Sequence, residues 1–214
     1  MKLRSVQATA TKWLYAIGIA TLLSACNGST SAPLPTETSE QVVTAATSTP
    51  LPPPTTVPPT SLPFQITSSG FAEAEVIPDR YACTGENLSP ELTWGEPPAG
   101  TQSLALIFDD PDAPGGSWVH WVIFNMPTDQ NSLPESVAPL AEHPDGSLSG
   151  SNSWNELGYG GPCPPQGSTH QYIFALFALD TVLELEAGAS KQEVLIAMEG
   201  HVLAETQISG LFSR

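Results

Sequence analysis

Basic residues are scarce in this sequence. Its 214 residues include 6 Lys and Arg against 22 Asp and Glu, which gives a formal net charge of -16 at pH 7. From residue 64 onward the only basic side chains are Arg80, Lys191 and Arg214. So acidic a surface repels the phosphates of nucleic acids and of anionic lipids. The composition therefore argues against nucleic acid and anionic membrane surfaces as partners.

Long apolar runs are also missing. A membrane-spanning helix needs about 20 consecutive apolar residues, and the run WLYAIGIATLL at 13–23 is roughly half that length. The basic residues that precede it are Lys2, Arg4 and Lys12. A short apolar core behind a basic leader predicts a secretory signal at 1–25.

The end of this signal, Leu-Ser-Ala-Cys, resembles that of a bacterial lipoprotein, which is cleaved before the cysteine and acylated on its sulfur. The lipid would then be attached to Cys26. An ordinary signal peptide with an incidental cysteine is the alternative. Because acyl chains contribute about 0.8 kcal/mol per buried methylene, we expect an exported lipoprotein held at the cell envelope. Asn27 resembles a signal for outer-membrane sorting if the cell is Gram-negative.

Residues 26–63 contain too few apolar side chains to form a core. They are mainly Ser, Thr, Pro and Ala, including TPLPPPTTVPPTSLP, and this composition predicts a disordered, partly polyproline tether. The remaining residues, 64–214, are expected to form one domain, since a chain of about 150 residues can bury about 68–70% of its unfolded surface.

Cysteine is rare, with three residues in the whole chain. Two of them, Cys83 and Cys163, fall in the expected domain. An even number of cysteines in an exported domain favours a disulfide. Two buried free thiols are the alternative.

Short apolar runs bounded by turn residues predict the strands of this domain. We expect strands at 64–67, 92–94, 103–110, 118–127 and 171–180. The last of these is apolar on both faces, which predicts a central strand covered on both sides. The segment 127–169 is rich in Gly, Pro, Ser and Asn and is expected to be a long loop.

One helix is expected near the end of the chain, where Ser190 and Glu193 have the spacing of a capping box. An apolar stripe follows, made by Val194, Leu195, Met198, Val202 and Leu203. Gly200 would lie inside this helix at a cost of about 1 kcal/mol relative to Ala, so packing must hold it. The domain is thus predicted to be mainly β with a peripheral C-terminal helix.

Two histidines lie where a strand meets a loop. Strand alternation places His120 on one face with Trp118, Val122 and Phe124, shortly after Asp110 at the end of the preceding strand. A second histidine, His170, begins the strand at 171–180. Strand ends next to loops are common places for binding sites, so a shared pocket is predicted. Two histidines satisfied by local hydrogen bonds in a β core are the alternative.

Several separated motifs resemble one protein family. They are YACTGENLSPELTW (81–94), DPDAP (110–114), WVHW (118–121), GPCPPQGSTHQYIFALFALD (161–180) and AMEGHVLAET (197–206). In this order they resemble the phosphatidylethanolamine-binding protein family, in its bacterial, Raf-kinase-inhibitor-like branch (YbhB/YbcL-like). The resemblance covers nearly all of 64–214.

The resemblance implies a β fold of two sheets with a small pocket for phosphate or a phosphorylated headgroup such as phosphoethanolamine, and neither a cofactor nor catalysis. The ligand-binding residues it implies are Asp110, His120, Pro164, Pro165, His170 and Tyr172, with Asp112 and Trp118 lining or bracing the rim. Gln171 stands where the family usually has arginine, which would remove a cation near the site. Trp154 and Tyr159 are expected to cover the pocket.

The expected chemistry rests on hydrogen-bond donors. A carboxylate beside an imidazole favours the imidazolium and raises its pKa, so Asp110 is expected to hold His120 or His170 charged, or to fix the tautomer. Amides of the loop GYGGPCPPQG are expected to donate to phosphate oxygens. Affinity for phosphate is therefore predicted to rise as the pH falls from 8 to 6.

Three other functions are considered. Ser117 or Ser168 with Asp and His would make a hydrolase, but neither serine lies in a Gly-x-Ser-x-Gly elbow. A metal site could use Asp109, Asp110, Asp112 and His120, although the prolines of this turn make it stiff. The third is a protein-interaction module that inhibits a kinase or protease of the envelope or of a host. His143 and His201 are expected to be exposed or packed.

Overall fold

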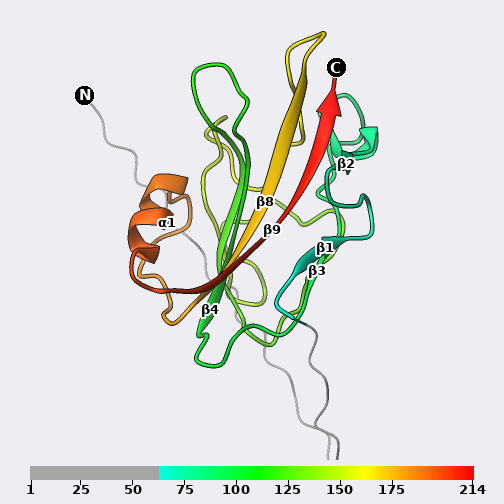
Figure 1. Cartoon of the computed structure of the whole chain (residues 1–214). Helices are drawn as coiled ribbons and strands as arrows, with labels where there is room; N and C mark the ends of the chain where they lie inside the picture. Colours follow the sequence, from blue (N-terminus) through cyan, green and yellow to red (C-terminus); the bar gives the residue numbers. More distant parts are fainter. Residues whose placement is uncertain (1–62) are drawn as a thin grey trace, which may run out of the picture. The chain divides into compact units, whose positions relative to one another are not determined.

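The computed structural model describes residues 63–214 (Figure 1). The expected signal peptide, Cys26 and the tether up to residue 62 lie outside the described residues. None of the helical segments between residues 63 and 214 has the length and hydropathy of a membrane span.

The described residues form eleven regular elements. In chain order these are β1 (Ile66–Ser68), β2 (Glu75–Val76), the 3-10 turn η1 (Asp79–Tyr81), β3 (Leu92–Trp94), β4 (Ser103–Asp110), β5 (Trp118–Met126), β6 (Ser132–Leu133), β7 (Leu148–Ser149), β8 (Thr169–Leu179), α1 (Lys191–Met198) and β9 (Val202–Ser213). The larger sheet has the order β2-β9-β8-β4-β5-β7, and the smaller has the order β1-β3-β6. The prediction of a mainly β domain with two sheets and a peripheral helix is confirmed.

Most strands form where short apolar runs predicted them. The runs at 92–94 and 103–110 are β3 and β4, and the run at 171–180 is β8, which begins two residues earlier, at Thr169. The first strand begins at Ile66, two residues later than expected. The long segment after β5 also holds two short strands, β6 and β7.

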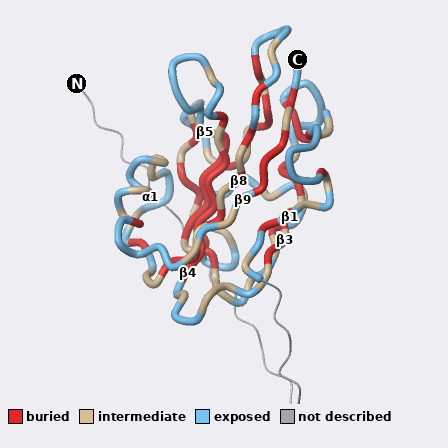
Figure 2. Tube along the Cα trace, in the orientation of Figure 1, coloured by how far each residue is buried: buried red, intermediate tan, exposed pale blue. Residues whose placement is uncertain are grey.

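Strand β8 is central, as predicted, because it pairs antiparallel with β4 on one side and β9 on the other. Its residues Tyr172, Phe174 and Leu176 are fully buried. On the opposite face, Ala175 and Phe177 are half-buried. One face of the sheet is therefore closed more completely than the other, and the buried residues concentrate along the middle strands (Figure 2).

Two apolar clusters cover the two faces of the larger sheet. The first lies against the smaller sheet and includes Leu92, Trp94, Leu106, Phe108 and Phe174. The second lies under the helix and includes Ile107, Val122, Phe124, Val194 and Met198. Figure 1 shows the resulting layers, with α1 on one side of the larger sheet and β1 and β3 on the other.

The helix is shorter than the apolar stripe predicted. It begins after Ser190, whose side chain and Glu193 form the expected capping box, and it ends at Met198. Gly200 has a φ of 82°, a left-handed conformation that glycine adopts without strain and that ends the helix. Val202 and Leu203 therefore belong to β9 and are largely exposed, so placing them on the helical stripe was wrong.

Candidate functional site

The central histidine of β5 is aimed by a β-bulge. In the pairing of β4 with β5, Phe108 is opposite Trp121 and Asp109 is opposite Val119, so His120 is an extra residue between them. Strict alternation predicted that His120 shares a face with Val122 and Phe124, and this is wrong, because those two side chains pack under the helix. The bulge turns His120 to the other face. Bulges often re-aim side chains beside functional sites.

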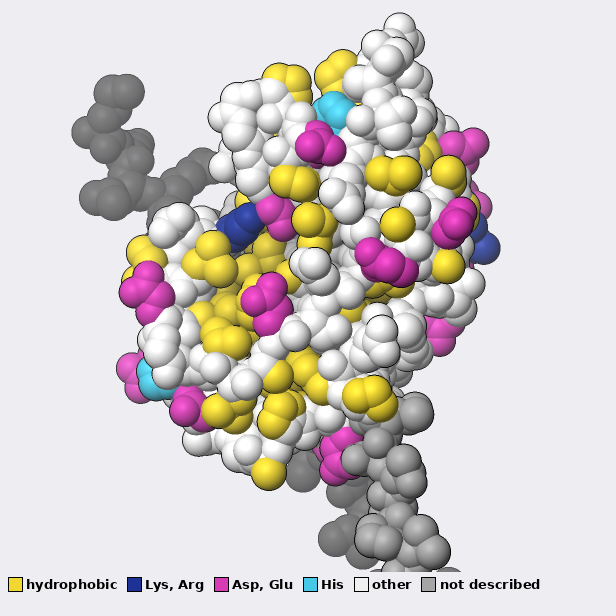
Figure 3. All heavy atoms as spheres, viewed as in Figure 1, with side chains coloured by type: hydrophobic (Ala, Val, Ile, Leu, Met, Phe, Trp, Pro, Cys, Tyr) yellow, Lys and Arg dark blue, Asp and Glu magenta, His cyan; other side chains and the backbone are white. Residues whose placement is uncertain are grey.

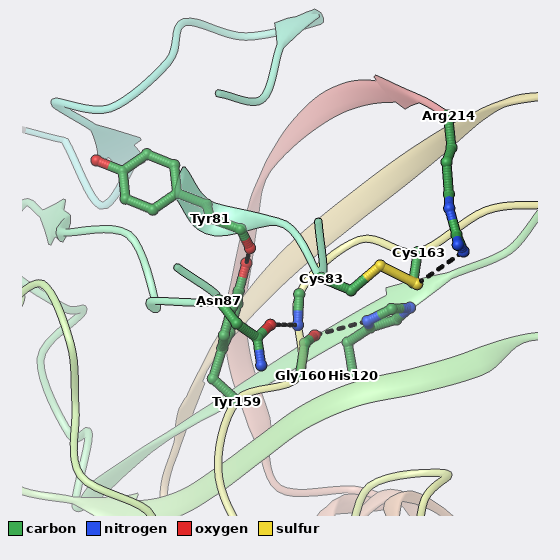
Figure 4. The surroundings of a disulfide bond; sticks show 9 residues. Tyr81, Cys83, Asn87, His120, Tyr159, Gly160, Cys163 and Arg214 are labelled. Carbon is green, nitrogen blue, oxygen red and sulfur yellow. Dashed lines mark hydrogen bonds between the residues drawn. A yellow bond between two sulfur atoms is a disulfide. The ribbon is translucent and has the colours of Figure 1, made fainter. Parts of the chain in front are cut away.

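His120 is buried and its orientation is fixed by Gly160. The ring Nδ1 lies 2.7 Å from the Gly160 carbonyl oxygen, and the Gly160 N–H donates to the His120 carbonyl at 2.9 Å. A carbonyl only accepts, so Nδ1 carries the hydrogen and the other ring nitrogen, turned away from Gly160, has a lone pair in the neutral ring (Figure 4).

Burial lowers the pKa of His120, and the Gly160 carbonyl and the charges of Asp110 and Asp109 oppose this shift without overcoming it. The expectation that a nearby aspartate would hold this imidazole charged is therefore wrong for His120. At neutral pH the ring presents an acceptor to the pocket rather than a donor.

The second histidine pairs with the first aspartate of the DPDAP turn. His170 Nδ1 lies 2.7 Å from Asp110 Oδ2, and both side chains are buried. The other carboxylate oxygen of Asp110 accepts the Asp112 N–H at 2.9 Å. Because Asp110 uses both oxygens within the protein, it fixes the ring of His170 and leaves the second nitrogen of that ring available.

A pocket of about 350 Å³ opens where β4 ends and β5 and β8 begin. Its lining includes Asp110, Trp118, His120, Pro164, Pro165 and His170, which are six of the eight residues that the sequence assigned to ligand binding. It also includes Ala113, Pro114, Trp154, Cys163 and Arg214. The structure thus brings the two imidazoles and one carboxylate together around a single opening.

Two indole rings form the rim of this pocket. Trp118 and Trp154 contact each other edge to face with ring centroids 5.4 Å apart, and they are 38% and 40% exposed. Trp154 also packs edge to face on His120 at 5.1 Å. Exposed aromatic rings at a pocket mouth offer both apolar contact and a face for a cation.

The loop that carries Trp154 is held in place by its own polar side chains. Asn152 Oδ1 accepts the N–H groups of Trp154 and Glu156, each at 3.0 Å. The Ser153 hydroxyl accepts the Val119 N–H at 2.8 Å, next to His120. A side chain at Gly160 would meet the Trp154 ring at 2.5 Å. Glycine is therefore required where the loop passes beneath the indole.

The wall of the pocket is cross-linked. Cys83 and Cys163 form a disulfide with Cα atoms 5.5 Å apart across a separation of 80 residues. Cys163 lies directly before Pro164 and Pro165, so the bond fixes the proline pair relative to the turn after η1 (Figure 4). In the chain-entropy model a loop of this length stabilises the fold by roughly 4 kcal/mol.

Four residues expected at the pocket lie behind it or elsewhere. Asp112 braces β8, because its Oδ2 accepts the Gln171 N–H at 2.8 Å. Tyr172 is buried beneath the histidines, and its hydroxyl makes no hydrogen bond of standard geometry to the described residues. Burial, followed by the charge of Asp110, raises the pKa of Tyr172. Tyr159 does not cover the pocket, since its ring stacks on Phe108 at 5.4 Å in the core.

The glycine-rich loop does not supply the amides that were expected. The Gly160 N–H binds His120, the Gly161 N–H donates to Asn87 Oδ1 at 2.8 Å, and the Gly167 N–H donates to the Arg214 carbonyl at 2.6 Å. A side chain at Gly161 would meet the Tyr81 carbonyl at 2.2 Å. These amides hold the loop in shape, so the ligand must find its donors among side chains.

The neighbouring aspartate faces the other side of the sheet. Asp109 Oδ2 lies 2.6 Å from Lys191 Nζ and also accepts the Ser117 hydroxyl. Ser168 donates to the Pro165 carbonyl at 2.7 Å. Neither serine contacts a histidine, so the arrangement required by the hydrolase alternative is not formed.

The metal alternative also lacks its geometry. Across residues 63–214 there is no group of three or more His, Cys, Asp or Glu side chains that could hold an ion. The other two histidines lie away from the pocket, with His143 on Ser149 Oγ at 3.0 Å and His201 on Asp180 at 2.8 Å. His201 follows α1 rather than lying within it.

The family model described as phosphatidylethanolamine-binding protein matches residues 67–213. The chain belongs to the phosphatidylethanolamine-binding protein family. The match covers the two sheets, the helix and the whole pocket lining except Arg214. This membership confirms the resemblance that the five motifs indicated.

Relatives in archaea and bacteria match the same part of the chain. The UPF0098 protein of Methanothermobacter thermautotrophicus is 54% identical over 151 residues, which cover 71% of this chain and 99% of the relative. The UPF0098 protein YbhB of Escherichia coli is 38% identical over 158 residues, covering 70% of this chain and 100% of YbhB. The name UPF0098 gives no activity.

Solved structures share the fold. A phosphatidylethanolamine-binding protein homologue, CT736 of Chlamydia trachomatis, has a TM-score of 0.65 and 35% identity and covers 71% of this chain and 97% of its own. Escherichia coli YbcL, described as a member of the mammalian family, has a TM-score of 0.65 and 32% identity and covers 71% and 98%. Both likenesses support the assignment of the fold and the family.

Proposed function

We propose that the domain is a non-catalytic binding module whose pocket takes a small phosphorylated or otherwise anionic ligand, such as phosphoethanolamine. The observation that carries this proposal is the convergence of His120, His170 and Asp110 on one opening of about 350 Å³. A pocket of this size admits a headgroup but little more. The printed name of the matching family, phosphatidylethanolamine-binding protein, supports the same ligand class.

The two imidazoles suit a phosphoryl group that carries a hydrogen. Neutral His120 offers the lone pair of the nitrogen opposite the one bound to Gly160, so it accepts from a P–OH group. A phosphate dianion has no such hydrogen, and its second pKa is about 6. The ligand therefore binds as the monoanion, or as the dianion with one proton taken up by His120.

The sign of the pH dependence follows from this proton. The complex holds one more proton than the free protein and the free dianion, so affinity rises as the pH falls from 8 to 6, by up to about tenfold per pH unit. Calorimetric titration of the purified protein with inorganic phosphate and with phosphoethanolamine at pH 6, 7 and 8 measures this. Repeating it in buffers of different ionisation enthalpy counts the protons taken up.

Matched histidine variants test the assignment of the proton. His120→Gln removes the ring at the pocket, whereas His143→Gln removes a histidine that lies outside the pocket lining. We expect His120→Gln to weaken binding and flatten the pH profile, and His143→Gln to leave both unchanged. Absence of binding at every pH would contradict the proposed function and would favour the alternative of a protein-interaction module, which a pull-down from envelope or host extracts tests.

We also propose that the domain is held at the outer face of a bacterial membrane through a lipid on Cys26. The basic leader, the short apolar core and the Leu-Ser-Ala-Cys sequence support this. In a bacterial host that processes lipoproteins, the full chain should fractionate with membranes and carry acyl chains by mass spectrometry. Cys26→Ser should lose both properties, and a Cys26→Ser chain that stays acylated or membrane-bound would contradict the anchor.

A further inference from the structure

Arg214 brings a guanidinium to the wall of the pocket. Its Nη1 lies 3.5 Å from Cys163 Sγ, on the disulfide that borders the opening (Figure 4). The residue is placed by strand pairing, because Ser213 is opposite Thr169 and the Arg214 carbonyl accepts the Gly167 N–H at 2.6 Å. Its backbone is therefore held beside the loop that leads into β8, while its side chain is exposed at the pocket.

This guanidinium is the basic group without an acidic partner in the described part of the chain. Arg80 pairs with Glu135 at 2.7 Å, and Lys191 pairs with Asp109 at 2.6 Å. No carboxylate of residues 63–214 lies within 4.0 Å of the Arg214 side chain. Acidic side chains are spread over the surface and basic ones are few (Figure 3). In so acidic a domain, an unpaired arginine at a pocket leaves its positive charge available for an anion.

The other groups of the pocket supply no permanent positive charge. Asp110 is a carboxylate, His170 donates to it, and His120 is neutral at neutral pH because burial lowers its pKa. Arginine stays protonated at any pH at which proteins are folded, and its planar donors match two phosphoryl oxygens at once. An anion that enters this pocket meets one fixed cation.

We propose that Arg214 is the residue that makes the pocket select a phosphoryl anion, through a two-point contact of its guanidinium with the ligand. This inference rests on the proposed function and deepens it. The histidines then read the hydrogen on the phosphoryl group, while Arg214 neutralises its charge. The rim indoles of Trp118 and Trp154 are left to contact the rest of the headgroup.

The same geometry removes the concern raised by Gln171. His170 and Tyr172 are buried on the pocket side of β8, and Gln171 between them is exposed and points to the other face. It is absent from the pocket lining. An arginine at position 171 would therefore not supply the charge that Arg214 supplies from the end of β9.

Two variants of equal charge test the proposal. Arg214→Gln and Arg80→Gln each remove one positive charge from the full-length protein, but Arg80 lies outside the pocket. Titration with inorganic phosphate and with phosphoethanolamine at pH 6 should show a loss of at least about tenfold in affinity for Arg214→Gln, the size of a lost charge-assisted contact. Arg80→Gln should stay within about twofold of the unchanged protein.

Further variants separate charge from geometry. Arg214→Lys should recover part of the affinity, because lysine keeps the charge but not the two-point contact. Adding Gln171→Arg to Arg214→Gln should recover none. Circular dichroism and thermal unfolding check that the exposed Arg214 position tolerates each change.

The outcomes distinguish this inference from the proposed function. If the unchanged protein binds phosphate and Arg214→Gln binds equally well, or if both charge variants weaken binding alike, the role of Arg214 is wrong and the proposed function stands. If Gln171→Arg restores binding, the charge acts from the other face of β8 and the assignment to Arg214 is likewise wrong. If the unchanged protein binds neither compound, the proposed function fails and this inference fails with it.

Discussion

Asp109 and Asp110 are neighbours at the end of β4, and they face opposite sides of the same sheet. Asp109 meets the ammonium of Lys191 and the hydroxyl of Ser117, beside a hollow of about 400 Å³ lined largely by Ser and Asn side chains. Asp110 meets the imidazole of His170 beside a pocket of about 350 Å³. The two hollows differ little in size, so volume does not distinguish them.

The difference lies in what each partner has left to offer. Lys191 and Ser117 bind Asp109 and each other, since Lys191 Nζ is also 3.3 Å from Ser117 Oγ, and this cluster is closed. His170 binds Asp110 through one ring nitrogen and keeps the second. An imidazole is the side chain that can hold a carboxylate and still present a donor or acceptor to a ligand. The residue opposite each aspartate therefore determines which one serves a site.

The disulfide supports only the Asp110 side, and removing it should have the largest effect. Cys83→Ser with Cys163→Ser frees the wall that carries Pro164 and Pro165. We expect the free energy of unfolding to fall by roughly 4 kcal/mol, measured by urea denaturation of the purified protein. Equal midpoints and slopes for the two proteins would show that the cross-link does not stabilise this side of the fold.

Alanine at each aspartate compares the two clusters directly. The side chains of the His170–Asp110 pair are 9% and 5% exposed, against 23% and 16% for Lys191–Asp109. Asp110→Ala leaves a buried ring N–H without an acceptor, so we expect a loss of roughly 2–3 kcal/mol. Asp109→Ala leaves an ammonium that water can reach, so the loss should be about 1 kcal/mol. Denaturant midpoints measured side by side give both values, and the reverse order would contradict the comparison.

The smallest expected effect concerns the helix that carries Lys191. The Ser190 backbone N–H, followed by the Ser190 hydroxyl, lowers the pKa of Glu193 at the start of α1. A carboxyl whose pKa is lowered on folding contributes stability above its ordinary pKa and loses it as the pH falls through the lowered value. Glu193→Gln should therefore lower the melting temperature slightly at pH 6, and the difference should vanish toward pH 3. A difference that persists in acid would contradict the role of the charge.

Apolar runs were sufficient to predict the sheet, because a short run such as 103–110 is long enough for a strand and too short for a helix. The capping box placed the start of α1 correctly. The end of the helix was predicted wrongly because Val202 and Leu203 continue an apolar stripe by chance. The left-handed conformation of Gly200 ends the helix, and periodicity cannot detect it.

The site was predicted as a set of residues but not as a geometry. Motifs identified Asp110, His120 and His170, whose convergence the structure shows and whose role in binding remains a prediction. Alternation placed His120 on the wrong face because a bulge depends on pairing with β4, which no local pattern encodes. Arg214 was counted as a charge and not assigned to the pocket. Pairing the last apolar run with 171–180 would have placed it there.

The bulge at His120 has a consequence for how this binding surface can be gained or lost. Regular pairing of Phe108 with Trp121 and of Asp109 with Val119 would resume if one residue were deleted from β5. The sheet would then lose an imidazole and keep its apolar core. A family of such domains can therefore switch between a binding member and an inert scaffold through a single deletion, with no cost in hydrophobic pattern.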